Sequence, residues 1–452
     1  MHPITPSSAG GLPKLAYVYH PLSFAPLSIT EAAADVCRMV WVVDSSVPAV
    51  DTYRRLLSKF GPVVDAADCP IEQVAKMVRA HAPDGVLSMH DADLVWTAQL
   101  ADLLGLPFHS LDCAIKLTDK RAQREALAAG GLSTPPFRVI DQDADTGVVA
   151  AIASEFHFPA VLKPLTGQSS RDTFPIASAA ELVATVAGLR GRGDAAPEPY
   201  IVEGFVPDAS EPLGGPGFAG FVSVESVVEG GRVASASVSA RTPFRWPFRE
   251  TGYCTPTALA PELEAEVCRV AERAARALGV TVGCLHTEIK LTDEGPVVIE
   301  VNGRPGGGMS EMLERASGFN ILKAALRLAV GAPVNLQGPV PCTRVGYLLY
   351  VFPETDCEFI DVVDGLADLK QLDGVDEVVL VRGPGERIDW REGSEAHVCH
   401  LTGTARDHDE LRRVIEATTT ILRIEGHDAP TEGDAVDTLT ASGVASVTVG
   451  TV

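Results

Sequence analysis

The segment from Cys284 to Arg304 constrains the fold more than any other part of the chain. Two runs that alternate apolar and polar residues, 284–292 and 296–304, flank the short stretch Asp293-Glu294-Gly295. Extended runs of this kind on either side of a tight turn predict a β-hairpin. The hairpin fixes which side chains of the two strands face each other.

The register of this hairpin follows if its first pair is Thr292 with Pro296. The opposed pairs are then Thr292 with Pro296, Lys290 with Val298, and Glu288 with Glu300. Two carboxylates directly across a strand pair lie roughly 5 Å apart and repel each other unless a cation lies between them. The segment therefore predicts a site for a divalent cation.

One face of the hairpin carries the polar residues, because side chains of a strand alternate with a period of two. That face holds His286, Glu288, Lys290, Glu300, Asn302 and Arg304. Carboxylate and amide oxygens are the ligands that Mg²⁺ uses when it shares its shell with phosphates. A solvated hairpin face with scattered charges is the alternative, and the Gly-rich stretch 303–308 that follows argues against it.

The first third of the chain alternates short apolar runs, at 15–19, 39–43 and 85–89, with helix-like segments. This alternation predicts a βαβ-type parallel sheet. Around Thr118 the sequence pattern changes, and a domain boundary is expected near residue 115. We expect a helix over 120–129, capped by Thr118 and ended by Gly130-Gly131.

The middle of the chain predicts a small α/β unit followed by a larger one. Strands are expected at 158–163 and 200–206, and a hairpin at 221–228 and 232–240 turns at Gly230-Gly231. Helices are expected from Pro261 to Leu278 and from Met309 to Val330. After Pro339, strands at 343–352, 375–381 and 397–402 and a helix over 411–422 predict a small α+β domain.

The net charge of the chain disfavours some classes of ligand. The chain has 452 residues, with 37 Lys plus Arg against 60 Asp plus Glu, a net charge of −23. Such a field disfavours nucleic acid and anionic membrane surfaces as partners. An anionic nucleotide can bind only where cations are concentrated locally. Nine cysteines without a CxxC pair, and no apolar run long enough to span a bilayer, predict a cytoplasmic protein.

On these residues the chain resembles the ATP-grasp carboxylate–amine ligases, and among them the L-amino-acid ligases that form dipeptides. Glu288 and Glu300, twelve residues apart, with the phrase Glu-Val-Asn-Gly-Arg ending at Arg304, match the Mg²⁺-binding pattern of that family, and His286-Thr-Glu-Ile-Lys290 is typical of its dipeptide-forming branch. The resemblance runs from about residue 15 to 425. It implies an ATP-grasp fold of mixed α/β and α+β class, with an N-terminal βαβ pre-ATP-grasp domain and a small C-terminal α+β domain.

The resemblance also implies an ATP site. Lys120 and Lys163 correspond to the two lysines that hold the nucleotide phosphates. The segment Thr166 to Thr173 falls where the family has a flexible phosphate loop, although an ordinary surface loop is the alternative. The expected ATP contacts are Lys120, Lys163, Gly167, Ser169, Ser170, the hinge Glu203, Gly204, Phe205 and Val206, and, for the ribose, Glu211. Glu203 would receive the adenine amine.

Metal and substrate residues follow from the same resemblance. Glu288, Glu300 and Asn302 would bind two Mg²⁺ ions, which Mn²⁺ could replace. The residues expected at the substrates are Asp91, Glu250, Tyr253, His286, Arg304 and Gly307, with Arg304 and Lys163 as the catalytic cations. The ligases carry Glu-x-x-His where this chain has Glu250 and Tyr253. Because this motif contacts the substrate, the expected substrate range does not carry over directly from the ligases. The surrounding segment 241–253 could instead be an aromatic surface loop.

The expected organisation is a pre-ATP-grasp domain over 1–115, a small subdomain over 116–210, a large subdomain over 211–338, a C-terminal domain over 339–426 and a tail over 427–452. The expected activity is amide or peptide bond formation between an amino acid or small acid and an amine, through an acyl phosphate, with release of ADP and phosphate. A homodimer is left open. The alternatives are an ATP-grasp carboxylase or nucleotide-precursor ligase, an inactive ATP-binding regulatory protein, and a dehydrogenase on the N-terminal half, which lacks the glycine fingerprint.

Overall fold

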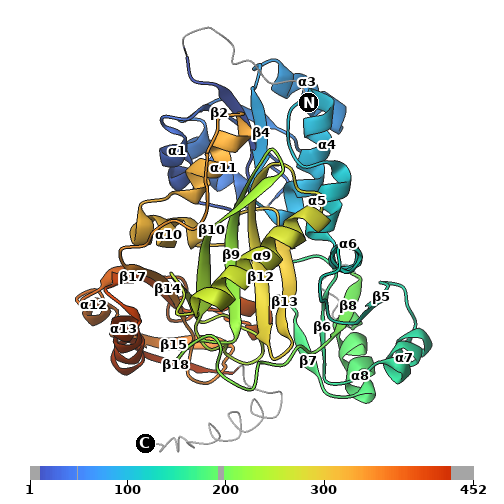
Figure 1. The fold of residues 1–452 in the computed structure, drawn as a ribbon, viewed down its shortest axis with the longest axis vertical. Helices are drawn as coiled ribbons and strands as arrows, with labels where there is room; N and C mark the ends of the chain where they lie inside the picture. The colour runs from blue at the N-terminus through green and yellow to red at the C-terminus, as the bar shows by residue number, and fades with distance from the viewer. Residues whose placement is uncertain (1–10, 48, 192–197, 429–452) are drawn as a thin grey trace, which may run out of the picture.

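The computed structural model describes residues 11–47, 49–191 and 198–428 (Figure 1). The expected tail, 427–452, lies outside these ranges except for its first two residues. The N-terminal part of the chain forms a parallel sheet in the order β3-β2-β1-β4. Its elements are β1 (Lys14–Val18), α1 (Pro26–Ala33), β2 (Arg38–Val43), α2 (Val50–Leu57), β3 (Val63–Asp65), α3 (Ile71–Arg79), β4 (Gly85–Ser88), the 3₁₀ turn η1 (Asp91–Asp93), α4 (Leu94–Leu104) and α5 (Leu111–Thr118).

Both faces of this parallel sheet are buried. Leu15 and Tyr17 of β1 enter one hydrophobic cluster, whereas Ala16 and Val18 enter another. A strand that is apolar at every position is expected where helices cover both faces of a parallel sheet. The predicted βαβ organisation is confirmed, and β3 is a strand that the sequence pattern did not reveal.

A second, antiparallel sheet has the order β5-β8-β6-β7 and lies at the lower right of Figure 1 beside α7 and α8. Its elements are α6 (Lys120–Ala129), β5 (Phe137–Ile140), α7 (Thr146–Glu155), β6 (Ala160–Pro164), β7 (Phe174–Ile176), α8 (Ala179–Arg190) and β8 (Tyr200–Gly204). Lys163 of β6 lies opposite Ile201 of β8, two residues before Glu203. The antiparallel pairing therefore places the Lys163 and Glu203 side chains diagonally on one face of the sheet.

The largest sheet has eight strands in the order β13-β12-β9-β10-β11-β14-β17-β16. Its strands are β9 (Phe221–Glu229), β10 (Arg232–Arg241), β11 (Gly252–Thr255), β12 (Gly283–Thr292), β13 (Gly295–Asn302), β14 (Val345–Val351), β16 (Val375–Leu380) and β17 (Cys399–Ala405). The C-terminal strands β14, β17 and β16 thus continue the sheet that holds the acidic hairpin. Nothing in the sequence pattern indicated this continuation.

Helices cover both faces of this central sheet (Figure 1). Helix α9 (Pro261–Ala277) packs on one face, where its Val267 belongs to the same hydrophobic cluster as Val224 and Leu285. On the other face, Ile321 of α11 (Ile321–Ala329) belongs to the cluster that contains Cys284. The remaining elements are α10 (Met309–Ser317), β15 (Phe359–Asp364), α12 (Leu366–Leu369), the 3₁₀ segment η2 (Trp390–Glu395), α13 (His408–Ile421) and β18 (Arg423–His427), which pairs with β15.

Two predictions about helices were wrong. Thr118 does not cap the helix over 120–129, because it is the last residue of α5. Asp119 caps α6 instead, where its carboxylate accepts a hydrogen bond from the Ala122 amide at 2.8 Å. The single helix expected over 309–330 is two helices, because Gly318 adopts a left-handed conformation (φ +78°) that ends α10 and Asn320 caps α11.

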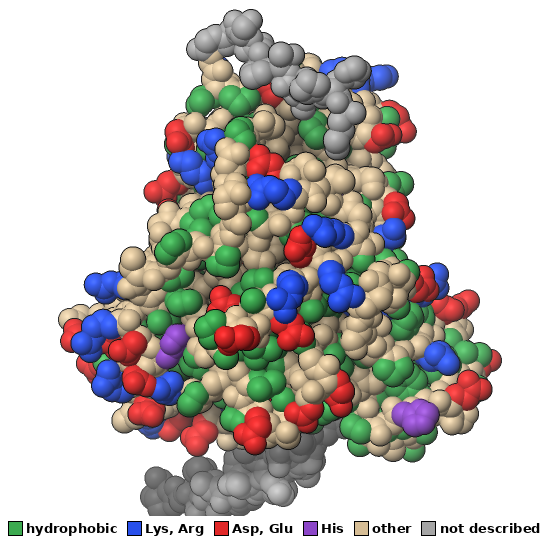
Figure 2. All heavy atoms as spheres, in the orientation of Figure 1, with side chains coloured by type: hydrophobic (Ala, Val, Ile, Leu, Met, Phe, Trp, Pro, Cys, Tyr) green, Lys and Arg blue, Asp and Glu red, His purple; other side chains and the backbone are tan. Residues whose placement is uncertain are grey.

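Acidic and basic side chains are interspersed on the molecular face seen in Figure 2, so the negative net charge is not gathered into one patch there. Among the described residues, no helix is both long and apolar enough to cross a membrane.

The packing between α9 and the central sheet predicts a clear difference between two leucine substitutions. Leu285 is fully buried in β12, so Leu285→Ala should lower the free energy of unfolding by about 2–5 kcal/mol. Leu111 is 44% exposed, so Leu111→Ala should change the free energy of unfolding by less than about 0.5 kcal/mol. Urea unfolding of both variants measures this, and equal effects would contradict the packing described.

Candidate active site

A cavity of about 1230 Å³ lies where the three sheets meet, and it collects nearly all of the predicted site residues. Those that line it are Lys120, Lys163, Gly167, Ser169, Ser170, Glu203, Gly204, Phe205, Val206, Glu250, Tyr253, His286, Glu288, Glu300, Asn302, Arg304 and Gly307. Two predicted residues are not among the lining residues. Glu211 is exposed on the segment after β8, and Asp91 reaches the cavity only through its contact with Arg304.

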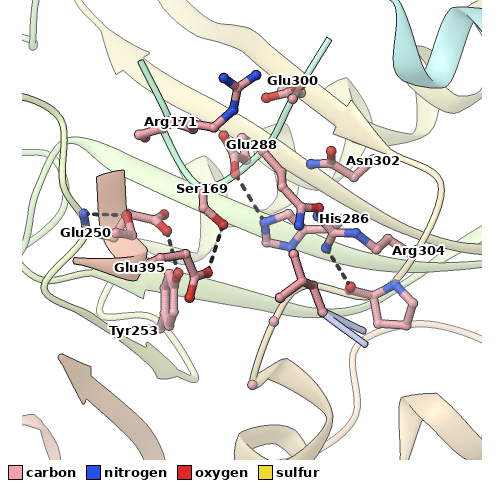
Figure 3. Close-up of a pocket in the computed structure, with 18 of the residues that line it drawn as sticks. Ser169, Arg171, Glu250, Tyr253, His286, Glu288, Glu300, Asn302, Arg304 and Glu395 are labelled. Carbon is pink, nitrogen blue, oxygen red and sulfur yellow. Dashed lines mark hydrogen bonds and ion pairs between the residues drawn. The ribbon is translucent and has the colours of Figure 1, made fainter. Parts of the chain in front are cut away.

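The acidic hairpin forms with Glu288 opposite Glu300, as predicted, and His286 lies opposite Asn302. Beyond this point the predicted register is wrong. Ile299 is an extra residue on β13, a β-bulge, so that Lys290 pairs with Val297 and Thr292 with Gly295. The bulge keeps the two carboxylates opposed while shortening the turn to two residues. Glu288, Glu300 and Asn302 all line the cavity (Figure 3).

Cationic side chains approach each of the two opposed carboxylates. The Lys120 ammonium lies 3.0 Å from a Glu300 oxygen, and it also donates to the Gly167 carbonyl at 3.0 Å. Glu288 lies 3.4 Å from His286 Nε2 and 3.8 Å from the Arg241 guanidinium. These contacts offset the repulsion across the hairpin. The two carboxylates and the Asn302 amide form an oxygen donor set that fits Mg²⁺.

His286 is held from behind by Glu225 of β9. Its Nδ1 is hydrogen-bonded to one Glu225 oxygen, while the other oxygen accepts the Gly306 amide at 3.2 Å. Burial lowers the pKa of His286, but the neighbouring Glu225 and Glu288 outweigh it and raise that pKa to about 9. The imidazole is therefore a buried cation at neutral pH. Glu225, which sequence reasoning missed, fixes both this ring and the Gly-rich turn.

Lys163 is held by a buried ion-pair network. Glu203 lies 2.7 Å from the Lys163 ammonium and 2.8 Å from Arg124 Nε, and Arg124 also donates to the Ile299 carbonyl. Burial alone would raise the pKa of Glu203, but Arg124 and Lys163 lower it to about 2. Both carboxylate oxygens thus accept hydrogen bonds from buried cations. The expected contact of Glu203 with an adenine amine stays a prediction.

Helix α6 supplies two further residues that sequence reasoning missed. Gln123 bonds both the amide and the carbonyl of Val301 at 2.9 Å, and Arg124 is fully buried. They follow Lys120 by three and four residues, which places all three on one helix face. That spacing was the available signal. Through these bonds α6 and the bulged strand β13 form one supported wall of the cavity.

Arg304 forms an ion pair with Asp91. Arg304 Nε and its terminal nitrogen lie 2.9 and 2.6 Å from the same Asp91 oxygen, Oδ2. The other Asp91 oxygen, Oδ1, is buried and has no hydrogen-bond partner among the described residues. Arg304 also donates to Gln168 at 3.3 Å, and Gln168 contacts His90 at 3.2 Å. Asp91 therefore orients Arg304.

The segment 241–253 also faces the cavity, instead of forming a detached surface loop. The buried Arg241 donates to Glu250 at 2.7 Å and to the Ser223 hydroxyl at 2.8 Å. Tyr253, where the resemblance to the ligases implies a histidine, donates its hydroxyl to the other Glu250 oxygen (Figure 3). Burial raises the pKa of Tyr253 well above its ordinary value, with Glu250 adding to the effect. The phenol is therefore neutral and acts as a donor.

The network around Glu203 predicts a dependence of stability on pH. Its pKa falls from 4.5 to about 2 on folding, so the stability it contributes is present above pH 4.5 and is lost as the pH falls toward 2. This shift corresponds to roughly 3 kcal/mol at neutral pH. Between pH 7 and pH 3.5, the free energy of unfolding measured with urea should fall by about 1 kcal/mol more in the wild type than in Glu203→Gln. Equal losses would show that Glu203 does not form these ion pairs.

Comparison with known proteins places this geometry in a family. Residues 156–312 match the family described as ATP-grasp domain. The chain is 27% identical to y4rH of Sinorhizobium fredii over 71% of its own length and 64% of the relative's, and 31% identical to carnosine synthase 1 of Homo sapiens over 57% and 32% of the two lengths. It thus covers less than two thirds of either relative. The structure of an L-amino acid ligase from Bacillus licheniformis superposes with a TM-score of 0.73, at 20% identity, over 92% of this chain and 99% of the other. The chain therefore has the ATP-grasp fold, and its residues 156–312 belong to the ATP-grasp domain family.

Proposed function

We propose that the chain is an ATP-dependent ligase that joins a carboxylate to an amine, with two amino acids, or an amino acid and a small acid, as its substrates. One observation carries the proposal: the opposed carboxylates of Glu288 and Glu300 share a single cavity with the cations Lys120, Lys163 and Arg304. Phosphoryl transfer needs positioning and charge neutralisation more than covalent chemistry from the protein. This cavity offers both.

The nucleotide would lie between the antiparallel sheet that carries Lys163 and the central sheet that carries Glu288 and Glu300. Lys120 and Lys163 would neutralise its phosphates, and backbone amides of the loop around Gly167, Ser169 and Ser170 would donate to phosphate oxygens. The hinge over 203–206 would meet the adenine edge through its backbone. The carboxylate of Glu203 would hold Lys163 in place, because Arg124 and Lys163 already occupy it.

Glu288, Glu300 and Asn302 would hold Mg²⁺. Their two carboxylates and one amide would supply enough oxygens for two ions to share. Mn²⁺ would be an acceptable substitute. When bound, the metal supplies positive charge that neutralises the phosphate oxygens. The protein orients these ligands through Lys120 on one side of the hairpin and His286 on the other.

In the proposed reaction, an oxygen of the substrate carboxylate attacks the γ-phosphorus of ATP. The bond between the γ-phosphorus and the bridging oxygen breaks, which gives ADP and an acyl phosphate. The amine then attacks the acyl carbon, loses a proton, and displaces inorganic phosphate. Arg304, oriented by Asp91, would stabilise the anionic adduct beside Gly307.

The similarity to carnosine synthase 1 and to an L-amino acid ligase supports amino acids as substrates. Glu250 and Tyr253 would form the wall that selects among them. Because Tyr253 is a neutral phenol where the ligases carry a histidine, the range of accepted side chains would differ from theirs. Asp91 does not line the cavity, so it would act on the substrates through Arg304, which it holds.

A screen of carboxylate and amine pairs with Mg·ATP tests the proposal, with phosphate release as the signal and mass spectrometry to identify the amide. Amide formation that depends on both substrates is the expected result. ADP release that responds to bicarbonate or formate, but not to amino acids, would favour an ATP-grasp carboxylase or nucleotide-precursor ligase. Binding of ATP without turnover for any pair would favour a regulatory protein.

The metal assignment predicts the effect of a single substitution. Glu300→Gln should lower the rate of amide formation about 10²–10³-fold, because a ligand charge at the phosphates is lost. Glu294→Gln is the matched control, since Glu294 lies in the turn of the same hairpin and does not line the cavity. The control should keep the wild-type rate. Unchanged product formation by Glu300→Gln would show that the metal assignment is wrong.

A further inference from the structure

The C-terminal part of the chain reaches the phosphate loop through one short segment, Trp390–Glu395, which we call the strap. The Ser394 amide donates to the Ser169 carbonyl at 2.9 Å, and the Asp172 amide donates to the Arg391 carbonyl at 2.9 Å. The Ser169 hydroxyl donates to Glu395 at 3.0 Å (Figure 3). Loop and strap are more than 200 residues apart in the sequence. These bonds therefore join two distant parts of the chain at the active site.

Gly393 makes this close approach possible. It is buried and has a left-handed backbone (φ +68°). A Cβ at this position would lie 2.0 Å from the Ser169 carbonyl oxygen and 2.6 Å from the Ser170 carbonyl carbon. Backbone atoms cannot move aside as a flexible side chain can. Only glycine therefore fits between the strap and the loop.

The conformation of the phosphate loop depends on such support. Ser169, Ser170 and Asp172 all have left-handed backbones, with φ of +57°, +57° and +46°. Residues other than glycine adopt this conformation at a cost of about 1–2 kcal/mol each. The three hydrogen bonds to the strap offset part of that cost, and Trp390 packs edge-on against Phe174 just beyond the loop at 5.8 Å. The strap thus favours this shape of the loop.

The strap also contacts the substrate wall. The Ser394 hydroxyl accepts a hydrogen bond from the Glu250 amide at 3.0 Å, and Glu250 is the residue that Arg241 and Tyr253 hold at the cavity. Ser394 and Glu395 themselves line the cavity. One segment therefore touches both the loop expected over the phosphates and the wall expected at the substrates.

We propose that Gly393, Ser394 and Glu395 are positioning residues that hold the phosphate loop closed over the reacting groups and tie its closure to the substrate wall. This inference rests on the proposed ligase function. Its consequence is protection of the acyl phosphate. With the loop held, water is excluded. With the loop released, water cleaves the linkage between acyl group and phosphate, which returns the carboxylate and phosphate and leaves ADP without amide.

The test compares three strap variants with a control. Gly393→Ala places a methyl group against the loop, and Glu395→Ala removes the acceptor for Ser169, whereas Glu395→Gln keeps a side-chain oxygen that can accept the same bond. Glu392→Ala is the control, because the exposed Glu392 carboxylate pairs with Arg382. Three quantities are measured: the rate of tryptic cleavage after Arg171 in the loop, the KM for ATP, and the ratio of ADP to amide.

Gly393→Ala should speed cleavage after Arg171 and raise the KM for ATP about tenfold, because a clash of this kind destabilises the docked loop. Glu395→Ala should also speed this cleavage and should raise the KM for ATP about three- to tenfold, as expected for one lost hydrogen bond. Both should raise the ratio of ADP to amide above one. Glu395→Gln should restore most of the wild-type behaviour, and Glu392→Ala should match wild type. If Gly393→Ala does not fold, the Glu395 pair carries the test.

Cleavage after Arg171 is measured first without nucleotide, so that it does not depend on the ligase activity. Wild-type cleavage rates in both Gly393→Ala and Glu395→Ala would overturn the inference, as would a wild-type ratio of ADP to amide in both. The two proposals can fail separately. If cleavage is faster in these variants but the protein forms no amide from any pair, the strap still holds the loop and the proposed ligase function is refuted.

Discussion

The opposition of Glu288 and Glu300 across one hairpin is the constraint on which the rest of the site depends. Two carboxylates at this spacing are unfavourable without positive charge nearby. Lys120 approaches one of them and the His286–Glu225 pair supports the other. In the proposed function, Lys120 would also meet the phosphates of a bound nucleotide. This local balance explains how a chain with a net charge of −23 can carry a site for a polyanion.

Cations at the cavity are held by carboxylates. Lys163 is paired with Glu203 and Arg304 with Asp91, and Arg241, behind the cavity wall, is paired with Glu250. A buried charge without a partner is costly, whereas a paired and hydrogen-bonded one is tolerated. The pairing also restricts each cation to one position. The site is therefore preorganised, which is the property that electrostatic stabilisation of a transition state requires.

Much of this arrangement could be predicted from the sequence, because its signals are local. Alternation with a period of two placed Glu288 opposite Glu300, and the apolar runs placed the parallel strands. The bulge at Ile299 could not be predicted, because Val297, Val298 and Ile299 are all apolar and do not show where the phase of the alternation shifts. The cap of α6 was assigned to Thr118 instead of Asp119 because both residues can cap a helix, and only the extent of α5 decides between them.

Contacts between distant segments left no such signal. The pairing of Glu203 with Arg124 and that of Ser169 with Glu395 join residues 79 and 226 positions apart. The continuation of the central sheet by β14, β17 and β16 likewise depends on edge hydrogen bonds that no sequence pattern specifies. Arg124 is the partial exception, since its position one helical turn after Lys120 marks it as facing the same wall.

Transfer of oxygen from the carboxylate substrate to phosphate tests the proposed chemistry most directly. The carboxylate identified by the screen is labelled with ¹⁸O, and the inorganic phosphate released with Mg·ATP and the amine is analysed by mass spectrometry. An acyl phosphate intermediate predicts one ¹⁸O atom from the carboxylate in each phosphate, together with formation of ADP. Unlabelled phosphate, or the label in AMP, would contradict the proposed reaction.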